Sequence, residues 1–449
     1  MMIIVAAITS TKRRALLEAR RSGRIMTIHE AARSGAVWDI RTSRSVELIG
    51  FGLCAASAVY LLASFMQGSY LLDREGHGVP ADFVSVWAAG RLVLDGHPEA
   101  AYNWTTILKA VEETALGIRF EGYYAWLYPP PFLFVAALLA TLPFAVAQAC
   151  WSILTFPAYV ITVRTIVGDR IGILLACAFP AILSNFMVGQ NGSLSAALLG
   201  GSLFFMERRP VLAGCFLGLL TYKPQLGLLF PVVLIAGGRW RAFWTAAGVG
   251  SLLILMSWAA FGTSAWIGFI HSMPIAAQAF LVEGQADWSK LQTLFGIVRS
   301  LGGSDTLAWW LQGLLIGVIT MLLCGLWRSS VSFDMKAAAL ASGALLSTPY
   351  LYMYDFVTLA VPMAFLVRAG MAEGFLRGEM IGLGGASLLI LVSPFMQAPI
   401  GPLALLIVAV LIGRRTFLQQ QSNPIMRRFL VRCGAARPHA ESSGRSGAC

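Results

Sequence analysis

Charged residues are scarce in this sequence. They make up 12% of its 449 residues, whereas hydrophobic residues make up 57%, and the mean hydropathy is +0.72. Soluble globular proteins carry roughly a quarter charged residues, so this composition argues against that class. The apolar runs are continuous and show no period of two, which excludes an outer-membrane barrel. The sequence therefore predicts an all-α polytopic membrane protein.

The sequence also lacks the patterns of several kinds of site. Its seven cysteines form no Cys-x-x-Cys pair and no cluster with histidine, so neither a structural metal nor a disulfide framework is expected. The net charge is +11, yet no basic stretch is interleaved with aromatic residues that could stack on bases. Nucleic acid is therefore not an expected partner.

The basic residues that are present gather at the two ends of the chain. Residues 1–45 carry nine Lys or Arg against three acids, and residues 416–449 are rich in Arg. Basic flanks of membrane spans stay in the cytoplasm, where they meet anionic lipid. We expect a basic cytoplasmic segment at 1–45, a transmembrane domain at 46–415 and an Arg-rich cytoplasmic tail at 416–449.

The longest polar interval, 68–129, follows the first apolar run. It holds eight acids and four bases, so it is expected on the outer side of a bacterial inner membrane, in the periplasm. Residues 83–95 have an amphipathic pattern, which predicts a helix lying in the membrane interface. Aromatic residues near the end of the interval are expected to anchor the chain at that interface: Tyr123, Tyr124, Trp126 and Tyr128.

Apolar segments recur between residues 48 and 413 and predict 11 to 13 transmembrane or re-entrant helices. The segments 210–221 and 226–237 are expected to form a short hairpin that enters from the cytoplasm, and 262–307 is expected to be a loop. Five crossings from a cytoplasmic N-terminus would place the basic residue 208 outside the cytoplasm. One of the early segments is therefore expected not to cross the membrane. The short segments 131–146 and 193–206 are the candidates.

Asp82 begins the interfacial helix, and two interpretations of it stay open. An Asp that follows a proline at a helix start is an ordinary N-cap. It could also be a carboxylate held at the membrane surface, able to take a proton from a hydroxyl group. The two roles are compatible, because a cap would also fix the direction of the carboxylate.

Two further polar positions interrupt apolar runs. Gln190 and Asn191 stand in a glycine-flanked turn, where they could simply join two helices or could bind sugar hydroxyls through their amides. Lys223 is at the tip of the expected hairpin, near mid-membrane depth. A lysine there either extends its stem toward water or meets an anion such as a lipid-linked phosphate.

The segment 349–355 carries three tyrosines at alternate positions, Tyr350, Tyr352 and Tyr354, followed by Asp355. The tyrosines are typical of an interfacial aromatic belt. Asp355 could pair with Lys223 or line the same cavity.

At this point the sequence resembles glycosyltransferase family 87, whose members are membrane transferases of the GT-C type that use polyprenyl-phosphate-linked sugars. The resemblance spans about 45–415 and rests on short motifs in a specific order: Ala81-Asp82-Phe83 through Trp87, Asp95-Gly96, Tyr128-Pro129-Pro130, Gly189-Gln190-Asn191-Gly192 and Tyr222-Lys223-Pro224. Many relatives carry histidine in the late outer loop, where this sequence has tyrosines and Asp355.

The resemblance implies a hexosyltransferase. A single carboxylate base is enough for inversion, and the sequence has no Asp-x-Asp motif for the metal of a nucleotide sugar, so no cofactor or metal is expected. The donor would be a polyprenyl-phosphate-linked hexose, typically mannose, and the acceptor a glycolipid, a polysaccharide or a protein. Asp82 matches the catalytic carboxylate, and Lys223 would bind the donor phosphate. Six residues are expected to contact substrate: Gln190, Asn191, Tyr222, Tyr352, Tyr354 and Asp355. The alternative is a transporter, flippase or polymerase-like protein that handles lipid-linked sugars. Transporters tend to show repeated halves, and none is visible here.

Overall fold

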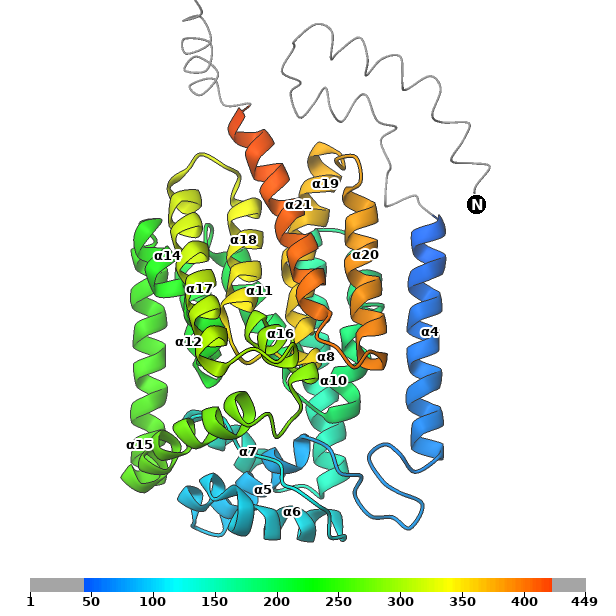
Figure 1. Cartoon of the computed structure of the whole chain (residues 1–449), viewed down its shortest axis with the longest axis vertical. Coiled ribbons are helices and arrows are strands. Elements are labelled where there is room, and N and C mark those ends of the chain that lie inside the picture. Colours follow the sequence, from blue (N-terminus) through cyan, green and yellow to red (C-terminus); the bar gives the residue numbers. More distant parts are fainter. Residues whose placement is uncertain (1–43, 422–449) are drawn as a thin grey trace, which may run out of the picture.

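The computed structural model describes residues 44–421, which form helices joined by short loops and contain no named strand (Figure 1). Of the expected terminal segments 1–45 and 416–449, residues 1–43 and 422–449 lie outside the described residues. Six helices within 44–421 are long and apolar enough to cross a membrane, as expected for a multi-pass membrane protein. They are α4 (Arg44–Met66), α8 (Phe144–Val167), α15 with η5 (Trp240–Val282), α17 (Asp305–Arg328), η7 with α19 (Met353–Glu373) and α21 (Gly401–Gln421).

The other helices of residues 44–421 are shorter. The first outer interval forms α5 (Phe83–Leu94), η1 (Pro98–Tyr102), η2 (Trp104–Leu108) and α6 (Lys109–Leu116), which gather at one end of the molecule (Figure 1). The middle of the chain forms η3 (Pro130–Phe132), α7 (Leu133–Leu139), α9 (Ile171–Cys177), α10 (Ala181–Val188) and α11 (Gly192–Phe205). The later short helices are α16 (Leu294–Ser300), α18 (Phe333–Ser347), α20 (Glu379–Val392) and η8 (Ser393–Phe395).

The expected hairpin is present. Its first arm is α12 (Pro210–Leu219) with η4 (Leu220–Tyr222), and its second arm is α13 (Pro224–Gly227) followed by α14 (Phe230–Ala236). Pro210 and Pro224 each stand at the first position of a helix, where the missing N–H costs nothing. Lys223 lies between the two arms, at the tip.

Two early segments depart from simple spans. The helical part of 131–146 runs only from Pro130 to Leu139, too short to cross a bilayer, so this candidate does not span. The apolar segment 171–187 is broken into α9 and α10, which are bent by 53° relative to each other. Pro180 at the break disfavours a continuous helix, because proline has no backbone N–H to donate and its ring clashes with the preceding turn.

The expectation of a loop at 262–307 is wrong in its first part. α15 continues through Gly262 to Ala276, and the backbone turns at Gly262, which has φ +72° and ψ 177°. Glycine tolerates this conformation without a Cβ clash. The helix after this kink carries His271 and leads into η5 and then η6 (Trp288–Lys290). The first helix therefore ends at Gly262, as the sequence suggested, and the apolar residues after it form a second helix.

The basic connectors meet at the end of the molecule opposite α5. Arg239 pairs with Glu207 at 3.1 Å, and the Arg328 guanidinium donates to the Ala236 carbonyl oxygen. At the same end, Arg415 is fully buried and donates to both Glu379 oxygens and to Glu373. The Arg415 contacts tie α19, α20 and α21 together, and none of these three charged residues lines the cavity described below.

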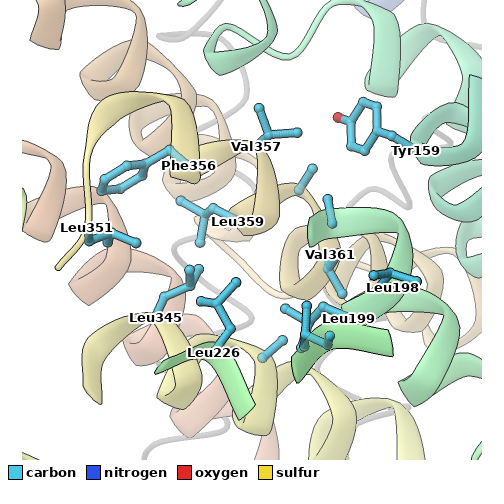
Figure 2. Close-up of a cluster of buried hydrophobic side chains, with 14 of the residues drawn as sticks. Tyr159, Leu198, Leu199, Leu226, Leu345, Leu351, Phe356, Val357, Leu359 and Val361 are labelled. Carbon is cyan, nitrogen blue, oxygen red and sulfur yellow. The ribbon is translucent and has the colours of Figure 1, made fainter. Parts of the chain in front are cut away.

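The core behind the cavity is a cluster of apolar side chains from distant segments (Figure 2). Leu198 and Leu199 of α11, Leu226 of α13 and Leu345 of α18 meet the η7 segment, whose Phe356, Val357 and Leu359 are fully buried. This packing fixes η7 against the hairpin tip and the start of α11. It therefore sets the relative positions of Asp355, Lys223 and Asn191.

Candidate active site

A cavity of about 1530 Å³ lies between the α5 end and the bundle. It is lined by seven of the eight residues that the sequence singled out: Asp82, Gln190, Tyr222, Lys223, Tyr352, Tyr354 and Asp355. The eighth, Asn191, is buried directly behind it and hydrogen-bonds to Lys223. Residues from four separate parts of the sequence thus converge on one space.

Asp82 does not cap its own helix. It precedes α5 with helical backbone angles, and its side chain accepts no hydrogen bond from the first turn. One oxygen instead accepts a hydrogen bond from the Gln190 side-chain amide at 3.1 Å. The N-cap interpretation is therefore wrong, and the carboxylate faces the cavity.

The turn that carries Gln190 is held from both sides. Gly189 ends α10 with φ +66°, and the Asn185 side chain accepts a hydrogen bond from the Gly192 backbone at 2.8 Å. The indole of Trp151 donates to the Gln190 carbonyl oxygen at 3.4 Å. These contacts fix the backbone, so the two amide side chains extend from a rigid turn.

Tyr128 links the two amides, a role that the sequence did not reveal. Its hydroxyl donates to the Gln190 oxygen at 2.9 Å and accepts from the Asn191 amide at 2.7 Å. It is buried and is not an exposed interfacial anchor. The Tyr102 hydroxyl and the Trp104 indole donate to the carbonyl oxygens of residues 128 and 126, which hold this extended segment in place.

Lys223 is buried, with 6% of its surface exposed, so its stem does not extend to water. Its ammonium donates to the Asn191 oxygen at 2.8 Å and forms an ion pair with Asp355. The other Asp355 oxygen accepts from the Tyr352 backbone N–H at 3.1 Å. Pairing with Asp355 offsets the desolvation cost of a buried ammonium.

The three predicted tyrosines occupy different positions around this ion pair. The Tyr222 hydroxyl hydrogen-bonds to Ser195 at 2.7 Å, which ties the hairpin tip to α11. The Tyr354 ring centroid lies 5.6 Å from the Lys223 ammonium, and the Tyr352 ring stacks on Tyr354 at 5.8 Å. These rings form an aromatic wall beside the cation, where an interfacial belt had been expected.

The environment of Asp82 favours proton uptake. Removal from bulk water raises the pKa of its carboxyl above the ordinary value, and the nearby charge of Asp355 adds to the rise. The hydrogen bond from Gln190 and the charges of Lys290 and Lys223 oppose it. A carboxylate with a raised pKa is a better base than a free aspartate, which suits it to take a proton from a hydroxyl.

One group within residues 44–421 has the spacing of metal ligands. Asp73, Glu75 and His77 place ligand atoms within 4.8 Å of one another in the loop after α4. One Asp73 oxygen already accepts from the backbone N–H groups of the other two, as in an ordinary turn. None of the three lines the cavity.

The model of glycosyltransferase family 87 matches residues 126–349, about half of the chain. The matched range is narrower than the resemblance over 45–415. It includes Tyr128, Gln190, Asn191 and Lys223, whereas Asp82 and Asp355 lie outside it. No curated protein and no solved structure matches the chain. The family match and the six apolar helices lead to one conclusion: the chain belongs to glycosyltransferase family 87 and is a multi-pass membrane glycosyltransferase.

Proposed function

We propose that this glycosyltransferase moves a hexose, with mannose as the family's typical sugar, from a polyprenyl-phosphate donor to an acceptor outside the cytoplasm. One observation carries the proposal. Asp82 and Lys223 face the same cavity and belong to one set of hydrogen bonds that runs through Gln190, Tyr128 and Asn191. A base and a cation are the two groups that transfer from a lipid phosphate requires.

In the proposed reaction Asp82 is the general base. The acceptor hydroxyl oxygen forms a bond to the anomeric carbon as its proton passes to the Asp82 carboxylate. The bond from that carbon to the phosphate oxygen breaks, and the electron pair leaves with the polyprenyl phosphate. Attack from the opposite face inverts the anomeric centre and needs no covalent intermediate or metal. One positioned base contributes typically about 10²–10⁴-fold.

Lys223 is proposed to contact the donor phosphate. An ammonium has three N–H donors, and Asn191 and Asp355 occupy two of them. The third is available on the cavity side, because Lys223 lines the cavity. The remaining lining residues, Gln190 and the aromatic wall of Tyr352 and Tyr354, are proposed to contact sugar hydroxyls and ring faces.

The proposed orientation follows from charge. The connectors with Arg239, Arg328 and Arg415 gather at the end opposite Asp82, and such connectors remain in the cytoplasm. The cavity would then open toward the periplasm of a bacterial inner membrane, with residues 46–415 as the transferase domain. The acceptor would be a glycolipid, a polysaccharide or a protein on that side.

The deciding experiment uses the purified protein in lipid vesicles with a radiolabelled polyprenyl-phosphate hexose. We expect release of polyprenyl phosphate only when an acceptor is present. Asp82→Asn should lower turnover at least about 100-fold while the protein still binds donor. Asp95→Asn is the matched control, since Asp95 ends α5 and pairs with Arg91 outside the cavity. Near-normal turnover of Asp82→Asn would show that Asp82 is not the general base. Transport of the labelled donor across the membrane without cleavage would favour a transporter.

A further inference from the structure

The buried end of the cavity has a cation but no net positive charge. Lys223 is neutralised by Asp355, and Asp82 adds a second carboxylate to the same space. In the proposed reaction a negative charge leaves Asp82 as it takes the proton, and one appears on the departing phosphate. A neutral ion pair stabilises that new charge less than a free cation does. The site therefore needs another positive group.

Lys290 is such a group. It lines the same cavity from η6, and its side chain is exposed at the cavity edge. Within residues 44–421 its ammonium has no ion pair at salt-bridge distance. Its charge acts across the cavity on Asp82, in the direction that keeps the carboxylate ionised.

The loop that presents Lys290 is held firmly. Asp287 has φ +66°, a conformation that costs free energy for a residue other than glycine, and its carboxylate accepts from the Ser289 backbone at 2.9 Å. The Asp287 carboxylate keeps its negative charge, lines the cavity as well, and attracts the Lys290 ammonium through that charge. On the other side, Gln292 donates its backbone N–H to the Leu351 carbonyl and accepts from the Gly401 backbone at 2.8 Å. A fixed loop orients a cation better than a mobile one does.

We propose that Lys290 binds the phosphate of the lipid-linked donor and stabilises the charge that develops on it as the sugar leaves. This inference rests on the proposed function. Lys223 would contact the same phosphate with its remaining N–H and, through Asn191, hold the amides that orient Asp82. Lys290 would supply a second positive charge to that phosphate. The site would therefore divide between two lysines the work that the sequence suggested for one.

The test measures steady-state kinetics with the labelled donor and inhibition by farnesyl phosphate, a short prenyl phosphate. We expect Lys290→Ala to raise the donor KM and weaken the inhibition, each about tenfold, with the acceptor KM unchanged. Lys290→Arg should restore most of both. The matched control is Lys109→Ala, because Lys109 lies on α6 at the same end but does not line the cavity.

The outcomes separate this inference from the proposed function. Equal inhibition of the Lys290→Ala and Lys109→Ala variants by farnesyl phosphate would overturn the role of Lys290, even if Asp82→Asn is inactive. An effect on the acceptor KM alone would assign Lys290 to the acceptor and overturn it too. Full turnover by Asp82→Asn with weakened inhibition in Lys290→Ala would instead keep the phosphate contact and remove the proposed base.

Discussion

A Cβ atom on Gly192 would lie 2.2 Å from the carbonyl oxygen of Tyr354, so the two backbones pack in direct contact. Gly192 begins α11, one residue after Asn191, and Tyr354 precedes Asp355 in η7. The two side chains that hold Lys223 thus come from segments that touch without any side chain between them. The close approach of these backbones positions the buried cation.

Gly192→Ala should therefore separate α11 from η7. We expect a loss of about 1–3 kcal/mol in the free energy of unfolding and a lower turnover, although alanine normally favours a helix. Thermal unfolding in detergent measures the first effect. Gly313→Ala is the control, since a Cβ there meets nothing within 4 Å. An unchanged melting temperature for Gly192→Ala would mean that the two segments shift apart freely.

Removing one partner of the Lys223–Asp355 pair should destabilise the protein more than removing both. Lys223→Met leaves a buried carboxylate and Asp355→Leu leaves a buried ammonium, and each should cost about 3–5 kcal/mol. The double variant should recover much of the stability but none of the activity. Unfolding of all four proteins forms a double-mutant cycle. Additive losses would indicate that the pair contributes no coupling.

Gln190→Leu should shift the pH dependence of turnover. The hydrogen bond from Gln190 lowers the pKa of Asp82, so its loss raises that pKa further above the ordinary value. Because the base works only when ionised, the acid limb of the rate profile should move to higher pH. Gln397→Leu is the control, since Gln397 lines the cavity but is not the residue that donates to the Asp82 carboxylate. A shift of the limb to lower pH would contradict the assigned contact.

Glu112 should make stability depend on pH. Burial raises its pKa to about 8, and the hydrogen bond from the Tyr124 backbone only partly opposes this. The folded protein therefore holds the proton more tightly than the unfolded chain, whose pKa is near 4.5. The contribution of Glu112 to stability should be complete below pH 4.5 and be lost as the pH rises toward about 8.

Glu112→Gln should remove this fall and raise the melting temperature at pH 8 relative to the parent protein. The neighbouring Glu113→Gln serves as the control, because Glu113 is partly exposed beside Lys109. Melting curves between pH 4 and pH 9 measure both. Parallel curves for the parent protein and Glu112→Gln would show that this carboxyl does not titrate in the window.

The hairpin around Lys223 could be predicted because prolines and basic connectors mark its ends in the sequence. The end of a helix at Gly262 could also be predicted, and the backbone there is non-helical, whereas the second helix, which continues to Ala276, could not. Helix breaks depend on what packs around them. A glycine can end one helix without determining whether the residues after it form another.

Some residues of the candidate site could likewise be predicted from the sequence and others could not. Lys223 and Asp355 stand out because charges in apolar runs need partners. Tyr128 does not stand out, because a tyrosine beside Pro129 at a predicted interface is explained as an aromatic anchor. Only the fold brings its hydroxyl between the amides of Gln190 and Asn191. For Asp82 the local sequence leaves a helix cap and a carboxylate base both open, because its hydrogen-bond partner is 108 residues away.

The hydrogen bonds between Lys223 and Asp82 can run in one direction only. An ammonium has no acceptor, so the Asn191 oxygen must face it and the Asn191 amino group must face Tyr128. The hydroxyl then has to give its proton to the Gln190 oxygen, which turns the Gln190 amino group toward the carboxylate. The positive charge of Lys223 thereby fixes which group donates and which accepts in each hydrogen bond of this chain. An acidic residue at position 223 would reverse every donor and acceptor in the chain and would turn the Gln190 amide oxygen toward the Asp82 carboxylate.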